Sequence, residues 1–171
     1  MFQRIISIAL LGSTPAFISA SSNAGEDATA LADTSSAPSV QCRNIEGSFH
    51  LSTYSGVGCS STQGLCGRVE WRGDLRATSE FVATSTTLTA DTPTTGVVLV
   101  TGDAVVTVGR RGTLMTKDAV VLRTLGAGDF AEVDTIVGGS GAFAGVSGAW
   151  RAWGTFQNNS GDGRYEGQLC F

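Results

Sequence analysis

The sequence predicts an all-β fold: a closed antiparallel up-and-down β-barrel of about eight strands, with a two-sheet sandwich as the alternative. Glycine is frequent and proline rare, 23 and 3 of 171 residues, and Val, Thr and Ser abound, which is typical of strands joined by tight turns. Short stretches of alternating apolar and polar residues recur along the chain. Two cysteines, Cys42 and Cys170, lie where a disulfide could join the first strand to the last.

The first 20 residues are expected to be a secretory signal peptide. Arg4 precedes an apolar run over residues 5–11, too short to span a bilayer, and small residues follow up to Ala20 or Ala24. A buried N-terminal helix is the alternative, but no helical apolar stripe continues the run. Residues 21–39 hold almost no large apolar side chain, which predicts a disordered linker. The folded domain is therefore expected at residues 40–171, secreted or in the lumen of the secretory pathway.

Charge and motifs exclude several function classes. Lys and Arg number 11 and Asp and Glu 15, which gives a formal charge of -4. This acidic balance argues against nucleic acid as the main partner, because phosphate binding needs a basic surface. The chain has no phosphate loop, dinucleotide fingerprint or metal-binding motif, so we expect neither a cofactor nor a metal.

The four cysteines are expected to form two disulfides. Cys59 and Cys66 enclose a short Ser- and Gly-rich stretch, while Cys42 and Cys170 lie at the two ends of the domain. We predict the pairs Cys59–Cys66 and Cys42–Cys170, the second joining strands that are neighbours in a closed barrel. A zinc site is the rival, but the chain has one histidine and no C-x-x-C pair.

Two stretches alternate most clearly. In residues 68–80 charged side chains share one parity and Val69, Trp71 and Leu75 share the other, which predicts one long strand with Gly73 as a possible bulge. Residues 98–108 place small and apolar residues on one parity, and the 110–112 turn then leads into a strand from Thr113 onward. Further strands are expected at residues 45–54, 81–89, 119–124, 130–137, 149–156 and 165–170.

One segment resembles a known family. Residues 134–148 carry the pattern G-G-[ST]-G-x-F-x-G-x-x-G at Gly138, Gly139, Ser140, Gly141, Phe143, Gly145 and Gly148. This pattern resembles the allene oxide cyclase and dirigent protein superfamily, and residues 101–108 are similar to that family's central Gly-Asp strand. The resemblance spans residues 97–156. The glycines are expected to be structural, providing positive φ and close packing, with Phe143 plugging the barrel end.

The resemblance implies an eight-stranded barrel whose interior binds a small, largely apolar compound, often in a trimer. Relatives of this kind steer ring closure or radical coupling. The resemblance supplies no catalytic residue, because none falls inside a segment that can be aligned.

Glu132 and Asp134 are the first candidates for acid–base chemistry. Their parity also carries Phe130 and Ile136, so both carboxylates could be buried with raised pKa values. In the alternative, Ala131, Val133 and Thr135 form the core face and the carboxylates are solvated. Asp103 is a third candidate, also with a solvated alternative.

Four aromatic residues are candidates for lining a ligand cavity, although core packing alone could explain them. They are Trp71, Phe81, Trp150 and Phe156. His50 is expected at the surface, which argues against a Ser-His-Asp triad, and pairs with Glu46 as an acid–base pair only if that face turns inward. Asn158 begins a glycosylation sequon.

The function expected first is a cofactor-independent isomerase or cyclase that binds a small, largely apolar reactive intermediate and directs its stereoselective ring closure, in secondary metabolism. The alternative is a non-catalytic secreted carrier of a small lipid-like ligand. A structural or surface-interaction role remains a third possibility.

Overall fold

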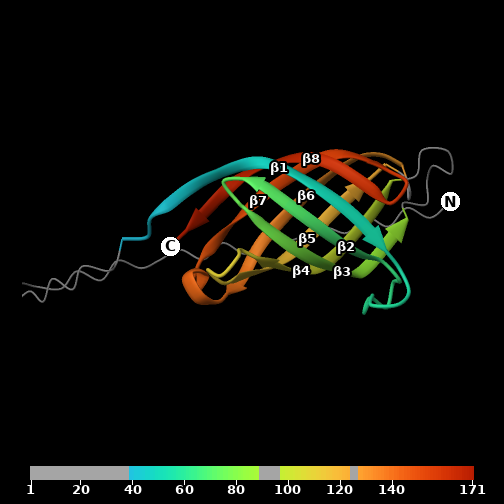
Figure 1. Cartoon of the computed structure of the whole chain (residues 1–171). Coiled ribbons are helices and arrows are strands. Elements are labelled where there is room, and N and C mark those ends of the chain that lie inside the picture. Colours follow the sequence, from blue (N-terminus) through green and yellow to red (C-terminus); the bar gives the residue numbers. More distant parts are fainter. Residues whose placement is uncertain (1–38, 89–96, 124–126) are drawn as a thin grey trace, which may run out of the picture. The chain divides into compact units, whose positions relative to one another are not determined.

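The chain folds into a closed barrel of eight antiparallel strands (Figure 1). The computed structural model describes residues 39–88, 97–123 and 127–171, so the expected signal peptide and the linker up to residue 38 lie outside the described residues. Each strand pairs with the next along the chain, and β8 closes the barrel against β1. The predicted fold class is therefore confirmed. The strands are β1 (Cys42–Tyr54), β2 (Cys66–Gly73), β3 (Ala77–Leu88), β4 (Val98–Thr107), β5 (Thr113–Leu122), β6 (Ala127–Gly139), β7 (Ser147–Gln157) and β8 (Ser160–Cys170).

Two predicted strand boundaries are wrong. Residues 68–80 form two strands, because Gly73 adopts a φ of +110° and ends β2 before the chain turns back into β3. The predicted alternation nevertheless holds across the turn, since Trp71 and Ser79 both face the interior and the Trp71 Nε1–H donates to the Ser79 Oγ at 3.0 Å. The two strands expected from Thr113 and at residues 119–124 are one strand, β5.

The first and last strands form the seam that closes the barrel. They pair from Cys42 opposite Cys170 to Ser52 opposite Ser160, and Figure 1 shows β1 lying beside β8. Both predicted disulfides, Cys42–Cys170 and Cys59–Cys66, are present. Two disulfides are consistent with an oxidising environment.

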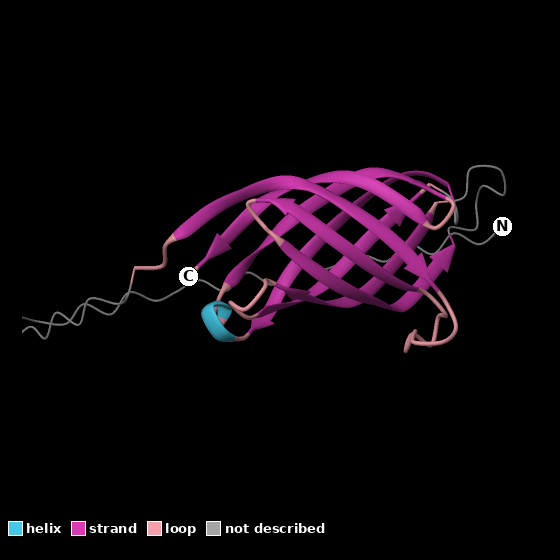
Figure 2. Ribbon diagram, in the orientation of Figure 1, coloured by secondary structure: helices cyan, strands magenta, loops and turns pink. Residues whose placement is uncertain are grey.

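One end of the barrel is filled. The 3₁₀ turn η1 (Gly141–Phe143) connects β6 to β7 (Figure 2). Its Phe143 side chain is buried in the apolar core. Gly141 and Gly148 adopt φ values of +61° and +131°, and a Cβ at either position would collide with backbone. The expectation that these glycines are structural is thus met by their backbone geometry.

An aromatic layer crosses the middle of the barrel. The Trp71 ring lies 5.3 Å from the Phe49 ring, 5.8 Å from that of Trp150 and 5.2 Å from that of Tyr165, measured between centroids. The last two contacts are edge-to-face, a favourable arrangement for aromatic pairs. This layer separates the filled end of the barrel from the open half described below.

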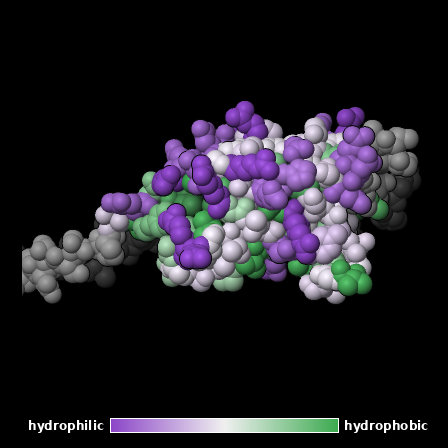
Figure 3. Space-filling view, viewed as in Figure 1, coloured by the Kyte–Doolittle hydropathy of each residue, from purple (hydrophilic) through white to green (hydrophobic). Residues whose placement is uncertain are grey.

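The outer wall has two different surfaces. Hydrophilic side chains dominate the face over β1 and β2 (Figure 3), and outer ion pairs such as Arg68–Glu80 lie on this side. On β4 to β7, by contrast, a row of outward side chains is apolar. Opposite one another in register, these are Leu99, Val121, Ala131 and Trp153. Within the described ranges, no helix has the length and apolar character to cross a membrane.

Candidate functional site

A cavity of about 330 Å³ occupies the half of the barrel away from η1. At the end of the barrel away from η1, the cavity is lined by residues near the strand ends, including Leu51 of β1, Leu122 of β5 and Phe156 of β7. Side chains of the aromatic layer, Trp71 and Trp150, line its deeper part. The volume lies at the lower limit for small-molecule sites, and most of the lining is apolar, as such sites require.

Three carboxyl groups interrupt this apolar lining. Glu132 and Asp134 project inward from β6, and Asp118 projects inward from β5, where it lies opposite Asp134 in register. Asp118 and Asp134 are buried, and Glu132 is partly buried. The structure therefore favours the interpretation in which the carboxylates share the core face with Phe130. The outward side chains of this strand are Ala131, Val133 and Thr135.

Burial changes the acidity of all three groups, which we call the carboxyl cluster. Loss of hydration, followed by the charge of Asp118, raises the pKa of Glu132 to about 8. Burial and the nearby charges of Glu132 and Asp118 raise the pKa of Asp134 well above its usual value. Burial likewise raises the pKa of Asp118. At neutral pH the carboxyl cluster therefore retains protons that exposed carboxylates would release.

Several polar atoms beside the cavity lack a hydrogen-bond partner within the described part of the chain. They are Asp118 Oδ1, Asp134 Oδ2, Thr116 Oγ1 and Trp150 Nε1. Thr116 and Trp150 each have only 2% of their surface exposed, and both line the cavity. Buried polar groups are almost always hydrogen-bonded in native proteins, so this concentration distinguishes the cavity from ordinary core.

The carboxyl cluster can perform two kinds of chemistry. With raised pKa values, a protonated member can donate a proton while an ionised neighbour accepts one. One oxygen from each of Asp118, Glu132 and Asp134 also lies within 4.8 Å of the others, so the three could hold a hard divalent cation. No metal was expected from the sequence, and Asp118 was not among the predicted site residues.

All four predicted ligand-binding aromatics line the cavity. Trp71, Phe81, Trp150 and Phe156 come from β2, β3 and β7. Gly102 of β4 makes room for Phe81, because a Cβ at that glycine would lie 2.2 Å from the Phe81 ring. The four residues thus occupy the predicted place, while ligand binding itself stays a prediction.

Asp103 does not belong to the site. It lies on the outer face of β4, where its carboxylate forms an ion pair with Lys117 of β5. The inward side chains next to it are the small residues Gly102 and Ala104. The structure thus matches the solvated alternative for Asp103, which does not line the cavity.

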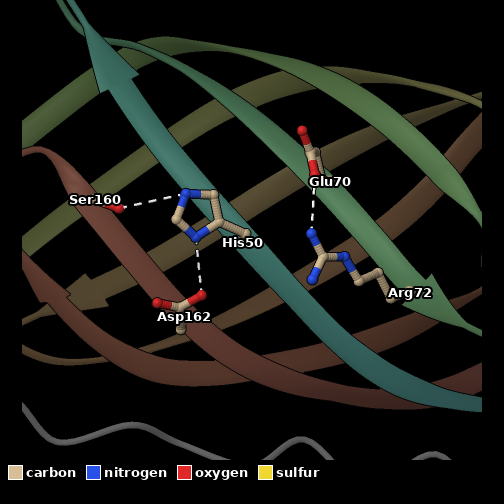
Figure 4. A network of polar contacts seen from close by, with 5 residues as sticks. All are labelled: His50, Glu70, Arg72, Ser160 and Asp162. Carbon is tan, nitrogen blue, oxygen red and sulfur yellow. Dashed lines mark hydrogen bonds and ion pairs between the residues drawn. The ribbon is translucent and has the colours of Figure 1, made fainter.

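His50 lies on the outer wall, as predicted, but it has partners that the sequence did not indicate (Figure 4). Its Nδ1 lies 2.8 Å from Asp162 Oδ1, and its Nε2 lies 3.5 Å from Ser160 Oγ. These contacts have the order of a Ser-His-Asp triad. However, the Asp162 side chain is 78% exposed, and the group faces away from the cavity. Solvent screens such a carboxylate, so we interpret the contacts as a polar network across the seam.

Asn158 lies in the β7–β8 turn at the open half of the barrel. Asn158 and Asn159 have φ values of 53° and 64°, which is typical of a two-residue hairpin turn. Asn158 is exposed, whereas Asn159 contributes to the cavity lining. Glycosylation of the sequon stays a prediction.

Asp118 and Thr116 were not predicted, although the sequence of β5 contains a signal for them. Leu114, Thr116, Asp118, Val120 and Leu122 share one parity of β5, and that parity faces inward. A carboxylate among large apolar residues was the criterion that selected Glu132 and Asp134. Applied to β5, the same criterion would have identified the third carboxyl group.

No protein-family model matches the chain, and no curated protein matches it.

Proposed function

We propose that the protein is a cofactor-independent isomerase or cyclase whose barrel binds a small, largely apolar molecule and whose carboxyl cluster transfers protons to and from it. One observation carries the proposal: three carboxyl groups, Asp118, Glu132 and Asp134, lie together at the wall of a cavity that is otherwise mostly apolar. A cavity that served packing alone would gain nothing from such groups, because burying them costs free energy.

Acid–base chemistry follows from the state of the carboxyl cluster. A group with a pKa of about 8, such as Glu132, is largely protonated at neutral pH and can donate its proton to a substrate atom. An ionised neighbour can accept a proton from another substrate atom, which leaves the total number of protons in the carboxyl cluster unchanged. The net result is isomerisation, so no oxidant, reductant or cofactor is required.

The shape of the cavity supports ring closure. Aromatic walls from Trp71, Trp150 and Phe156 restrict the conformations of a bound flexible molecule and exclude water. The resemblance of residues 134–148 to allene oxide cyclases and dirigent proteins adds support from fold analogy. We place this activity outside the cell or in the lumen of the secretory pathway, in agreement with the two disulfides.

Native mass spectrometry of the protein purified from its own host tests binding first. A defined compound that co-purifies would identify the ligand class, and its precursor would then serve as substrate. Incubation in D₂O tests proton transfer: wild-type protein should produce the isomer or introduce solvent deuterium, and Asp134→Asn should do neither.

The test separates catalysis from transport. Binding without product and without deuterium incorporation would contradict the enzymatic proposal and favour the carrier. A protein that is purified without a ligand and binds none from a host metabolite extract would contradict both the enzymatic proposal and the carrier. A surface-interaction role would then be favoured.

We further propose that copies of the protein associate through the apolar row on β4 to β7. Leu99, Val121 and Trp153 are 40%, 45% and 39% exposed there, and large exposed apolar patches commonly mark interfaces. Light scattering should show an oligomer that Val121→Lys converts to a monomer. A wild-type monomer at micromolar concentration would contradict this.

A further inference from the structure

We propose that the molecule bound in the cavity carries a protonated amine, which lies against the carboxyl cluster while its apolar body contacts the aromatic walls. This inference rests on the proposed function, since it names the chemical class of the ligand that the same cavity binds.

The first argument is the balance of charge inside the barrel. Three acidic side chains line the cavity, and none of the other described residues that line it carries a positive charge. On the outer wall, Lys117 already pairs with Asp103, and Arg151 pairs with Glu166. Buried charges are normally paired, so a positive charge on the ligand is the complement that the cavity lacks.

The second argument is the arrangement of acceptors. A primary ammonium group has three N–H donors, and the carboxyl cluster offers three carboxyl groups with oxygens within 4.8 Å of one another. Thr116 adds a fourth acceptor: its Oγ1 is buried and has no partner within the described ranges. This hydroxyl lies against Asp118, so the independent sign of a ligand is the indole N–H of Trp150, which is buried, lines the cavity and has no acceptor among the described residues.

A divalent cation fits the surroundings less well. Calcium takes six to eight oxygen ligands and magnesium takes six in an octahedron. The carboxyl cluster and Thr116 supply oxygens at this place, but other neighbouring lining residues, among them Trp150 and Phe130, offer rings rather than oxygens. Aromatic faces attract organic cations, which is the combination that an apolar amine would use.

Trp150 restricts the chemical class of the ligand further. Its indole N–H is buried and has no acceptor among the described residues. Because this group can only donate, the ligand should also present one acceptor, such as a hydroxyl or carbonyl oxygen. The expected class is thus a small aromatic or alicyclic amine with one oxygen function.

Binding should be linked to proton release. Burial raises the pKa values of Asp118, Glu132 and Asp134, so the free carboxyl cluster retains protons at neutral pH. An ammonium group favours one ionised carboxylate and therefore displaces one proton to solvent, which leaves the cluster's remaining protons for the proposed transfer. Other charged groups nearby lie on the outer wall and are paired there: Asp103 of β4 with Lys117 of β5, and Arg151 of β7 with Glu166. The inward residues of β4 and β7 that line the cavity have no titratable group. Affinity should rise up to tenfold for each pH unit between about 6 and 8.

The experiment compares an amine with its neutral analogue. The fluorescent neutral probe N-phenyl-1-naphthylamine reports occupancy of the cavity. Tryptamine and tryptophol compete for it; they carry an ammonium and a hydroxyl at the same position of one ring system, and only the hydroxyl can also accept from Trp150. Tryptamine should compete at least tenfold better than tryptophol at about pH 8, and the difference should fall below about twofold at about pH 5. Calorimetry in two buffers of different ionisation enthalpy should detect the released proton.

Variants localise the effect. Glu132→Gln should reduce the preference for tryptamine at least fivefold while leaving tryptophol binding unchanged. Asp162→Asn, which changes a carboxylate on the outer wall, is the matched control and should keep the wild-type preference. If Glu132→Gln fails to fold, Asp118→Asn provides the same comparison.

Each contrary result has a different meaning. Equal competition by tryptamine and tryptophol, with the probe still bound, would overturn the amine and leave the cavity intact. Absence of probe binding would contradict the proposed function itself. Thermal stabilisation by Ca²⁺ or Mn²⁺ that depends on Glu132, without any effect of tryptamine, would replace the amine by a metal ion.

Discussion

Two titratable groups on opposite sides of one barrel wall differ in an instructive way. On the outside, His50, Ser160 and Asp162 have the hydrogen-bond order of a catalytic triad, with one contact at 2.8 Å. On the inside, the carboxyl cluster contains polar atoms without any partner in the described ranges, such as Asp134 Oδ2. Contact geometry alone would favour the outer group as the catalytic one. Burial favours the carboxyl cluster, because water screens the charges of the outer group and does not screen those of the cluster.

The largest expected difference between the two groups is in activity. Asp134→Asn or Glu132→Gln should lower turnover about 100-fold or more, the usual contribution of general acid–base catalysis. Asp162→Asn should stay within about twofold of wild type, because that carboxylate lies outside the cavity. Rates of product formation, or of deuterium incorporation from solvent, measure both. Full activity in both inner variants would remove the carboxyl cluster from the mechanism.

The next difference is in the dependence of stability on pH. Because the folded-state pKa of Glu132 is about 8 and thus raised, the folded protein holds a proton that the unfolded chain releases. The contribution of Glu132 to the free energy of unfolding is therefore fully present below about pH 4, and it is lost as the pH rises through 8. The unfolding free energy should fall by ~1–3 kcal/mol between about pH 5 and 9.

Urea denaturation at a series of pH values measures this loss. Glu132→Gln should flatten the dependence, whereas Glu166→Gln on the outer wall should keep it. A wild-type profile that is already flat across this range would show that the carboxyl cluster ionises normally in the folded protein.

A smaller effect is expected at Thr116, whose buried hydroxyl lacks a partner among the described residues. Thr116→Val keeps the shape and removes the polar atom, so the free protein should become more stable by ~1 kcal/mol. Ligand affinity should fall in the same variant. Calorimetric melting with and without ligand measures both the gain in stability and the loss of affinity. A destabilised variant would indicate that the Thr116 hydroxyl is already hydrogen-bonded in the free protein.

The smallest effect is expected on the outside. His50→Gln should change the unfolding free energy by less than ~0.5 kcal/mol, because an exposed charged network contributes little. Thermal melting of this variant beside wild type is sufficient. A loss above ~2 kcal/mol, or any loss of turnover, would show that the outer group matters more than its exposure suggests.

The sequence predicted the barrel well because its interior and exterior alternate along each strand. It predicted the inward residues of β4 and both disulfides. It could not decide the orientation of Glu132 and Asp134, because this wall is apolar on both faces: Val133 is 51% exposed on the same strand. The alternation of apolar and polar residues identifies the inward face of a strand only where the outward face is polar.

Contacts across the seam were beyond sequence reasoning for a different reason. His50 and Asp162 are 112 positions apart, and they meet only because of the register between β1 and β8. Gly73 shows a similar limit, since a glycine in an alternating stretch predicts a bulge and a turn equally well. In the structure its φ is +110°, and a Cβ at this position would lie 2.7 Å from the Glu46 carbonyl oxygen of the neighbouring strand.

The seam has a consequence for the order of the chain. Cys42 and Cys170 lie opposite each other with Cα atoms 4.0 Å apart, so a short peptide could replace the disulfide as the connection between β8 and β1. New ends could then be opened in the exposed hairpin at Arg110, between β4 and β5. Such a circular permutant would keep every strand pair and the whole cavity. In this topology no strand is intrinsically first.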